Sequence, residues 1–496
     1  MSDQQVQSGM QNTVSPTPML FPEPESMRPT LIGERYMISA GHPLVAQVCA
    51  EVLEAGGTAI DAGVAGGLAS NVVQVDMCNL GGVAPILVRQ AGSSQVHSIS
   101  GVGHWGSEVT LEAYKSRYGD TMPLGVGIGI VPAAADAWIC TLKNFGTMSF
   151  AEVAEGARRI AEDGFLLDAR TATALEIMGR TFKQWPSSRE VYWPQERAPK
   201  LGERLRQPAL ARLLGTLMHV ETGETRDVAL DNVRSVFYEG DASEHIVSFS
   251  QQHGGWLTQD DLAQFACEVK SATSINYHGQ QVFTTDTVTQ GPVLLQALGI
   301  LAGFDVAAMG HNSSDYLHVV TEALKLAFSE RERCYTDPKW MTEPLDELLS
   351  EGYLEHLRNM ISMTSVLDDL PTLNHHQSNQ LSQQTSTRHD TTYLCVIDSD
   401  GNAFSATPSD TLDGGPIIPE LGISISPRGV QNRLQAEHPA VIEAGKRPCI
   451  TPAPALAMTA SSDKSANAKL IAFGAPGGDV IVQAMLQAFL NMTHFD

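Results

Sequence analysis

The chain of 496 residues is 43% hydrophobic and 18% charged, which is typical of a globular protein with a substantial core and excludes collagen-like, coiled-coil and wholly disordered chains. The length corresponds to one large α/β unit or to about three ordinary domains. Asp and Glu number 56 and Lys and Arg only 32, so the net charge of −24 disfavours nucleic acid and anionic membrane surfaces as partners.

The first region, residues 1–33, is polar and carries five prolines, and this composition predicts a disordered N-terminal arm. Its first ten residues have neither the basic start nor the apolar segment of a secretory signal. No apolar window of the chain is long enough to cross a membrane. The seven cysteines are scattered singly, without a C-x-x-C pair, which disfavours a disulfide framework and a zinc site. We therefore expect a soluble, cytoplasmic protein.

Helical patterns follow the arm. Pro43 suits a first helical turn, apolar residues recur every four positions after it, and a Gly-Gly pair ends this helix. Asp61 opens a second helix that is rich in glycine and alanine, and we expect it to be pressed against a sheet because glycine otherwise weakens a helix. Amphipathic helices are predicted over residues 149–165 and 315–333.

The last third of the chain changes character. Residues 371–389 contain only two aliphatic side chains, which predicts a flexible linker, and the three histidines there lack the spacing of metal ligands. Apolar alternation over 391–397 and 403–407, around a Gly-containing turn, predicts a β-hairpin. Near the end, a strand over 469–473 leads into a Pro-Gly-Gly turn, and Asp479 is expected to cap a final helix.

One motif suggests a nucleotide-binding alternative. The sequence GVGHWG at 101–106 fits G-x-G-x-x-G between a predicted strand and a predicted helix, as in dinucleotide-binding oxidoreductases. However, His104 and Trp105 place bulk where a phosphate must approach, and Asp120 lies in a turn rather than at the tip of a second strand. These departures disfavour the nucleotide site.

The junction of Asp390 and Thr391 joins the linker to the hairpin. A threonine at a strand edge is common, so position alone favours a structural role. The alternative is a nucleophile made by self-cleavage, in which Thr391 Oγ1 attacks the Asp390 carbonyl and the freed amine, with a pKa near ~7.7–8.0, then serves as base. The turn holding Gly477 and Gly478 either is a simple tight turn or supplies backbone N–H donors for an oxyanion.

Several segments match the motifs of one family. They are GHPLVAQVCAEVLEAGGTAIDAGVAGGLASNVV (41–73), LGG (80–82), FGTMSFAEVAEGARRIAEDGFLL (145–167), GGWLTQDDLAQF (254–265), QGPVLLQALGIL (290–301), the predicted helix over 317–338, DTTYLCVIDSDGNAFSATPSD (390–410), GKRPCITPAPALAM (445–458) and FGAPGGDV (473–480). In this order they resemble the γ-glutamyltransferase family of N-terminal nucleophile hydrolases.

The resemblance implies a mixed α/β (α+β) fold, the four-layer αββα sandwich. It also implies self-cleavage into a large chain, 34–390 with the preceding arm, and a small chain, 391–496, which remain partners and hydrolyse a small-molecule amide through an acyl-enzyme without a cofactor or metal. Thr391 matches the nucleophile, and Gly477 and Gly478 match the oxyanion donors. Ser409 stands where the family has a threonine that helps to activate the nucleophile.

The substrate-binding positions depart from the family. No arginine for the substrate carboxylate lies at 100–103, and SPRGVQN at 426–432 replaces the stretch that holds the glutamyl amine. Thr451 stands at the paired serines, and Thr411 replaces an asparagine. The pattern looks closer to the oxamate amidohydrolase-like branch, which implies a small α-oxo amide acid as substrate. A compact anion needs a cation, for which Arg428 and Arg433 are the candidates.

Two alternatives stay open beside this amidohydrolase. One is a γ-glutamyl transpeptidase or glutathione hydrolase with a different set of recognition residues. The other is an uncleaved, non-catalytic binding protein, which is credible because the chain stops at Asp496, directly after the last predicted helix. The small chain would have 106 residues, short for the family, so we expect the sandwich to lack its last strands.

Overall fold

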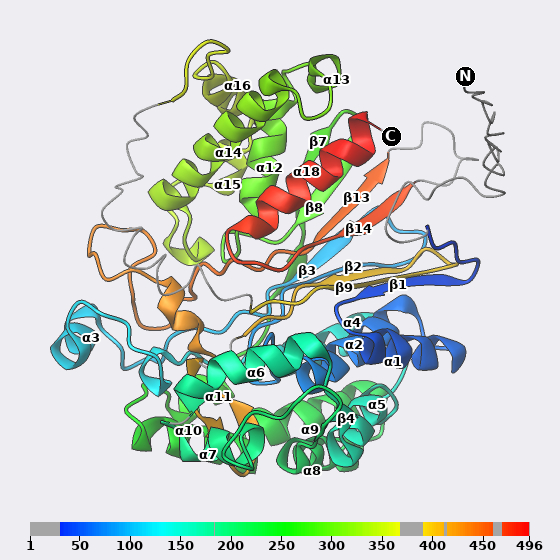
Figure 1. Ribbon diagram of the computed structural model, residues 1–496, viewed down its shortest axis with the longest axis vertical. Helices are drawn as coiled ribbons and strands as arrows, with labels where there is room; N and C mark the ends of the chain where they lie inside the picture. The colour runs from blue at the N-terminus through cyan, green and yellow to red at the C-terminus, as the bar shows by residue number, and fades with distance from the viewer. Residues whose placement is uncertain (1–29, 183, 368–389, 411–413, 460–468, 496) are drawn as a thin grey trace, which may run out of the picture. The chain divides into compact units, whose positions relative to one another are not determined.

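The computed structural model describes residues 30–182, 184–367, 390–410, 414–459 and 469–495 (Figure 1). From Arg35 onward, the described residues form one compact unit. Residues 30–33, the described part of the predicted arm, are exposed coil. The rest of the arm, the predicted linker at 371–389 and Thr411 lie outside the described residues.

Two antiparallel sheets form the centre of this unit. The larger sheet has the strand order β1-β9-β10-β2-β3-β6, and the smaller sheet has the order β14-β13-β8-β7. The strands span Tyr36–Ala40 (β1), Ile86–Arg89 (β2), Val96–Ile99 (β3), Val269–Ser271 (β6), Thr273–Tyr277 (β7), Gln280–Thr284 (β8), Leu394–Asp398 (β9), Ala403–Ala406 (β10), Ala455–Thr459 (β13) and Leu470–Phe473 (β14). The predicted hairpin is therefore β9–β10, in the interior of the larger sheet, where β1 and β2 flank it.

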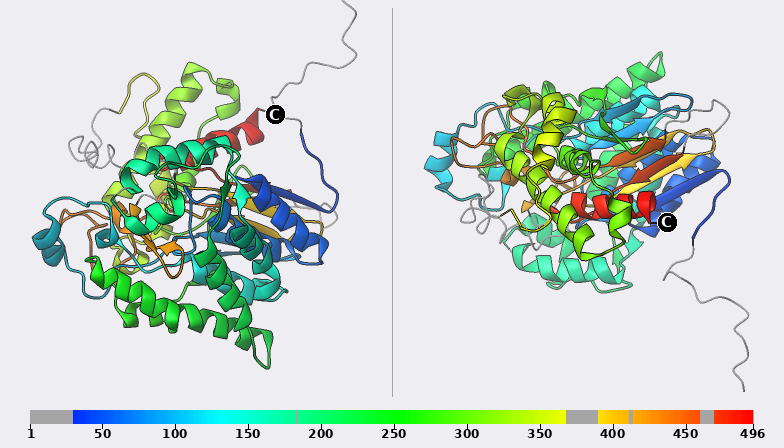
Figure 2. Two further views of the ribbon diagram at one scale, coloured as in Figure 1. Left: turned by 60° about the horizontal axis from the view of Figure 1, so that its bottom comes forward. Right: turned by 90° about the horizontal axis from the view of Figure 1, so that it is seen from above.

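The two sheets face each other across an apolar layer, and helices cover their outer faces. Leu87, Val96 and Ala403 of the larger sheet cluster with Phe283 and Leu456 of the smaller one. The outer helices are α1 (Pro43–Glu54), α2 (Ala59–Val73) and α4 (Ala134–Phe145) on the larger sheet, and α12 (Gly291–Leu301), α14 (Ser314–Cys334) and α18 (Val480–His494) on the smaller one (Figures 1 and 2). This arrangement confirms the four-layer αββα sandwich.

Helix α2 is the predicted small-residue helix, and its environment explains its composition. All of its residues are buried, and it packs on α1, α4, α5 (Phe150–Asp163) and both strands of the hairpin. A Cβ atom at Gly63 would lie 2.2 Å from the ring of Phe404 in β10, so only glycine allows this approach. The helix begins earlier than predicted, because Thr58 is the N-cap and exchanges hydrogen bonds with Asp61.

The other predicted helices are confirmed with one correction. Helices α5 (Phe150–Asp163) and α14 match the two amphipathic predictions, and helix α18 follows the Pro-Gly-Gly turn. Asp479 occupies the N-cap position of α18 but makes no side-chain cap. Its carboxylate instead accepts a hydrogen bond from Arg331 Nη1 at 2.7 Å, because this partly buried cation competes for it.

The structure does not support the dinucleotide motif. Strand β3 is antiparallel to both neighbours, β2 and β6, whereas a dinucleotide fold needs a parallel strand–turn–helix unit. The next helix, α3 (Leu111–Tyr118), begins later than the motif requires and is capped by Thr110. Trp105 is wholly buried, and its Nε1 donates to Asn432 Oδ1 at 2.8 Å, so this residue belongs to the core.

Shorter elements and a group of helices complete the unit. They are η1 (Val126–Ile128), β4 (Phe165–Leu166), α6 (Ala169–Phe182), α7 (Pro186–Tyr192), β5 (Arg204–Leu205), α8 (Pro208–His219), α9 (Arg226–Tyr238), α10 (Asp241–Gln252), α11 (Gln259–Ala263), α13 (Val306–Met309), η2 (Pro338–Trp340), α15 (Leu345–Leu348), α16 (Glu351–Arg358), β11 (Ile417–Ile418), β12 (Ile423–Ser424) and η4 (Pro427–Gln431). Among the described residues, no helix combines the length and the apolarity needed to cross a bilayer.

Candidate active site

The register of the central hairpin brings two predicted residues face to face. Leu394 of β9 lies opposite Ala406 of β10, and the same register places Thr391 opposite Ser409 in an antiparallel bridge. Ser409 also bridges to Val83, whose backbone N–H donates to the Ser409 carbonyl at 3.2 Å. The eighteen-residue spacing between the two hydroxyl residues is thus a consequence of the hairpin.

The two hydroxyls form a buried pair. Thr391 Oγ1 and Ser409 Oγ are 2.8 Å apart, and both residues are wholly buried. The following residue, Thr392, donates through Oγ1 to Gln74 Oε1 at 3.0 Å, which fixes the strand against α2. The sheet therefore holds the predicted nucleophile and the predicted helper hydroxyl in contact with each other.

The peptide bond before Thr391 lies within the same cluster. The carbonyl oxygen of Asp390 accepts hydrogen bonds from Ser409 Oγ at 2.7 Å and from Arg428 Nη2 at 3.2 Å. Arg428 lies in η4 and also donates to Ser409 Oγ. Its Nη2 atom is 3.2 Å from the Asp390 carboxylate, so one arginine contacts both the backbone and the side chain of Asp390.

A buried aspartate that the sequence did not single out, Asp410, adds a second carboxylate to this cluster. Asp410 Oδ1 is 3.6 Å from Arg428 Nε, and the Asp410 carboxylate accepts from Asn79 Nδ2 at 3.2 Å. A Cβ atom at Gly82 would lie 2.7 Å from Asp410 Oδ2, so the Leu-Gly-Gly motif lets the backbone approach this carboxylate. The signal that could have identified Asp410 is its place directly after Ser409, opposite that motif.

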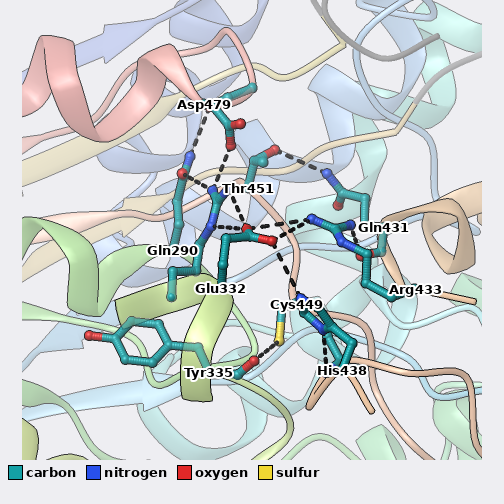
Figure 3. A network of polar contacts seen from close by, with 12 residues as sticks. Gln290, Glu332, Tyr335, Gln431, Arg433, His438, Cys449, Thr451 and Asp479 are labelled. Atoms are coloured by element: carbon teal, nitrogen blue, oxygen red, sulfur yellow. Dashed lines mark hydrogen bonds and ion pairs between the residues drawn. The ribbon is translucent and has the colours of Figure 1, made fainter. Parts of the chain in front are cut away.

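Side chains of two helices of the smaller sheet's outer layer contact the glycine turn after β14. Gly477 and Gly478 have φ angles of 123° and 64°, which side-chain-bearing residues rarely adopt. Gln290, the N-cap of α12, donates through Nε2 to the Gly478 carbonyl at 2.8 Å, and Arg331 donates to Asp479. Figure 3 shows Gln290 and Asp479 within this network, with dashed lines for their polar contacts. Gly474 of the same segment packs on Tyr393, since a Cβ there would lie 2.3 Å from that ring.

Glu332 connects this support to the segment after η4 (Figure 3). Its carboxylate lies 2.9 Å from Arg331 Nη2, 3.1 Å from Arg433 Nη2 and 3.5 Å from His438 Nε2. Burial raises the pKa of Glu332, but the hydrogen bond with His438 and the charges of the two arginines lower that pKa well below its usual range. Arg433 is thus paired with Glu332, whereas Arg428 lies at the Asp390–Thr391 junction.

Of the other positions considered from the sequence, Thr451 lies among the described residues and three histidines do not. Thr451 Oγ1 accepts a weak hydrogen bond from Gln431 Nε2 at 3.4 Å, at the C-terminal end of the segment that carries Arg428. Among the residues that the structure describes, no group of three or more His, Cys, Asp and Glu side chains could hold a metal ion. His375, His376 and His389 lie outside the described residues.

The αββα sandwich, with a buried hydroxyl pair just before its interior strand β9, is the fold of the N-terminal nucleophile hydrolases, and the protein is an enzyme of this class. A family model described as Gamma-glutamyltranspeptidase matches residues 45–496, so the chain belongs to the γ-glutamyltranspeptidase family. Proenzymes of this family cleave themselves into a large and a small subunit.

Relatives of different specificities share the sequence and the fold. The chain is 31% identical over 461 residues to the glutathione hydrolase-like YwrD proenzyme of Bacillus subtilis (strain 168), covering 91% of this chain and 81% of the relative. It is 27% identical to the acylase ACY 1 proenzyme of Pseudomonas sp. (strain V22), covering 93% and 80%. The crystal structure of cephalosporin acylase from Bacillus halodurans superimposes with a TM-score of 0.82 at 29% identity, covering 97% and 84%.

Proposed function

We propose that this chain cleaves itself between Asp390 and Thr391 and then hydrolyses a small amide that carries a carboxylate, with oxamate as its simplest form. The observation that carries the proposal is the contact of the Thr391 and Ser409 hydroxyls beside the Asp390 carbonyl. Cleavage turns the Thr391 nitrogen from an amide into an amine, which can accept the proton of its own hydroxyl.

In the proposed reaction, the residues named above have the following roles. Thr391 Oγ1 attacks the amide carbon, the Thr391 amine takes its proton and returns it to the leaving ammonia, and the N–H groups of Gly477 and Gly478 stabilise the oxyanion. Water repeats the attack on the ester and releases the acid. Arg428, a buried cation that contacts Ser409 and Asp390, anchors the substrate carboxylate.

The two chains stay together after cleavage because their strands alternate. In the larger sheet, β9 and β10 of the small chain lie between β1 and β2 of the large chain. In the smaller sheet, β13 of the small chain pairs with β8 of the large chain. Separation would break both sheets, so we expect a stable complex of residues 34–390 and 391–496.

A denaturing gel tests the self-cleavage. Scaling the mass of 53.3 kDa by chain length gives fragments of about 42 and about 11 kDa, and N-terminal sequencing of the lighter one is expected to begin Thr-Thr-Tyr-Leu. Thr391→Ala is expected to give a single band at full length. A wild-type protein that stays intact and releases no ammonia from oxamate would contradict the proposal.

The names of the relatives favour a second candidate, a glutathione hydrolase. This enzyme would use the same nucleophile, Thr391, but would take a γ-glutamyl group from its substrate as the acyl group. Parallel assays of oxamate and γ-glutamyl-p-nitroanilide separate the two candidates, because Arg428 offers one cation for a compact anion whereas a glutamyl group also needs a partner for its amine. Turnover of the γ-glutamyl compound alone would select the second candidate.

A further inference from the structure

Arg428 contacts the residue on the N-terminal side of the peptide bond that is to break, the bond between Asp390 and Thr391. One nitrogen, Nη2, lies 3.2 Å from the Asp390 carbonyl oxygen and 3.2 Å from the Asp390 carboxylate, and it also donates to Ser409 Oγ. The residue is only 4% exposed, so water screens its charge poorly. Besides a longer contact with Asp410, at 3.6 Å, the guanidinium therefore touches both the backbone and the side chain of Asp390.

We propose that Arg428 is a catalytic residue of the self-cleavage reaction and that Asp390 is the side chain that positions it. This inference rests on the proposed function, because it concerns how Thr391 becomes a chain terminus. It assigns Arg428 two successive partners, the Asp390 peptide before cleavage and a substrate carboxylate afterwards.

The charge that develops in the reaction falls on the atom that Arg428 contacts. When Thr391 Oγ1 adds to the Asp390 carbonyl carbon, the π electrons of the carbonyl move to its oxygen, which becomes an oxyanion. Two donors already face that oxygen, Arg428 Nη2 and Ser409 Oγ. Preorganised donors of this kind stabilise the transition state more than the ground state, because the charge on the oxygen grows between the two.

The later steps balance without a further reagent. The oxyanion collapses, the bond between the carbonyl carbon and the Thr391 nitrogen breaks, and the proton lost by Oγ1 is taken up by that nitrogen. The product is an ester between Asp390 and Thr391 Oγ1 with a free Thr391 amine. Water hydrolyses the ester to a new carboxylate at Asp390 and restores the Thr391 hydroxyl.

Asp390 has a distinct part in this arrangement. Its carboxylate compensates the buried Arg428 charge in the intact chain and holds the guanidinium over its own carbonyl. The same contact occupies Arg428, the cation that would bind a substrate carboxylate. In the uncleaved chain, therefore, neither Arg428 nor Thr391 is available to a substrate. Cleavage frees Asp390 to leave as a chain end and exposes Arg428 to a new anion.

The test is the rate of cleavage in freshly made full-length chain. Wild type, Arg428→Gln, Arg428→Lys and Asp390→Asn are synthesised in a cell-free system, synthesis is stopped, and the fraction cleaved is followed on gels. Loss of one oxyanion donor slows a reaction by ~100–1,000-fold, so this is the expected effect of Arg428→Gln. Arg428→Lys keeps the charge and is expected to be intermediate. Asp390→Asn keeps the carbonyl contact and is expected to cleave faster than Arg428→Gln.

Arg447→Gln is the matched control. Arg447 is also buried, at 7% exposure, and it also pairs with a buried aspartate, Asp337, with its Nε 2.9 Å from Oδ2. Its loss costs folding stability in the same way but touches neither Asp390 nor Thr391. We expect Arg447→Gln to lower the melting temperature and to cleave at the wild-type rate.

Chemical rescue separates a catalytic role from a structural one. In Arg428→Ala, added methylguanidinium is expected to restore cleavage in a concentration-dependent way, whereas it should not change Thr391→Ala. Arg428→Gln that is folded and cleaves at the wild-type rate overturns this inference and leaves the proposed function intact. Wild type that never cleaves overturns both.

Discussion

Gln290 provides a sharp test of the proposed oxyanion site, because it contacts the backbone of the glycine turn. Its Nε2 donates to the Gly478 carbonyl at 2.8 Å, and its Oε1 accepts from Arg331 Nη1 at 3.3 Å. Gln290→Leu removes both contacts and leaves the Arg331–Asp479 pair as the remaining support of the turn. Gln290 is therefore a positioning residue, and its substitution should affect turnover more than binding.

The expected fall in kcat of Gln290→Leu follows from these contacts. A hydrogen bond between uncharged groups contributes about 0.5–1.5 kcal/mol, and about 1.4 kcal/mol corresponds to a tenfold change in rate. Complete loss of an oxyanion donor would cost ~100–1,000-fold. Because Arg331 still holds Asp479, we expect kcat to fall by roughly tenfold, with KM little changed.

The assay measures kcat and KM separately for ammonia release from oxamate, or for γ-glutamyl-p-nitroanilide if wild type turns over only that compound. Gln296→Leu is the matched control, since Gln296 lies in the same helix, is wholly buried, and donates to the Leu348 carbonyl at 3.2 Å, away from the glycine turn. It should lose stability and keep kcat. Equal kcat values for the Gln290 and Gln296 variants would refute the role of Gln290. If Gln290→Leu misfolds, Gln290→Glu repeats the test, because glutamate keeps the shape of the side chain and loses its N–H donor.

Three further outcomes are expected. Ser409→Ala should slow both self-cleavage and turnover by about 100-fold, measured on gels and by ammonia release, and a wild-type rate would contradict the role of the hydroxyl pair. Gly63→Ala should destabilise the protein by about 1–3 kcal/mol, measured by denaturant unfolding, because its Cβ would meet the Phe404 ring, whereas Gly352→Ala in α16 has open space and should be neutral or slightly stabilising. Burial raises the pKa of Asp61, but hydrogen bonds from Met148, Thr58 and Thr147 outweigh it and lower that pKa. The stability from Asp61 is therefore present above ~pH 4 and lost as pH falls below that value, so the stability difference between wild type and Asp61→Asn should shrink on acidification; a difference independent of pH would contradict this.

The sequence predicts the local part of this site well and the distant part poorly. The hairpin signal at 391–407 depends on neighbouring residues, and its register alone would place Ser409 opposite Thr391. Gln290 and Asp410 were missed because their partners are far away in the sequence. Gln290 is 188 residues from Gly478, and Asn79 is 331 residues from Asp410. Only the packed sandwich brings such pairs together.

Asp479 shows how tertiary contacts override a local rule. An aspartate before a helix predicts a side-chain cap, because the first N–H groups of a helix lack partners. The guanidinium of Arg331 offers a stronger, charge-assisted partner, and the carboxylate turns to it. The helix loses a cap, and the glycine turn gains an attachment to α14. Gly477 and Gly478 are a further case in which geometry decides the residue type, because their positive φ angles are strained for any residue with a side chain.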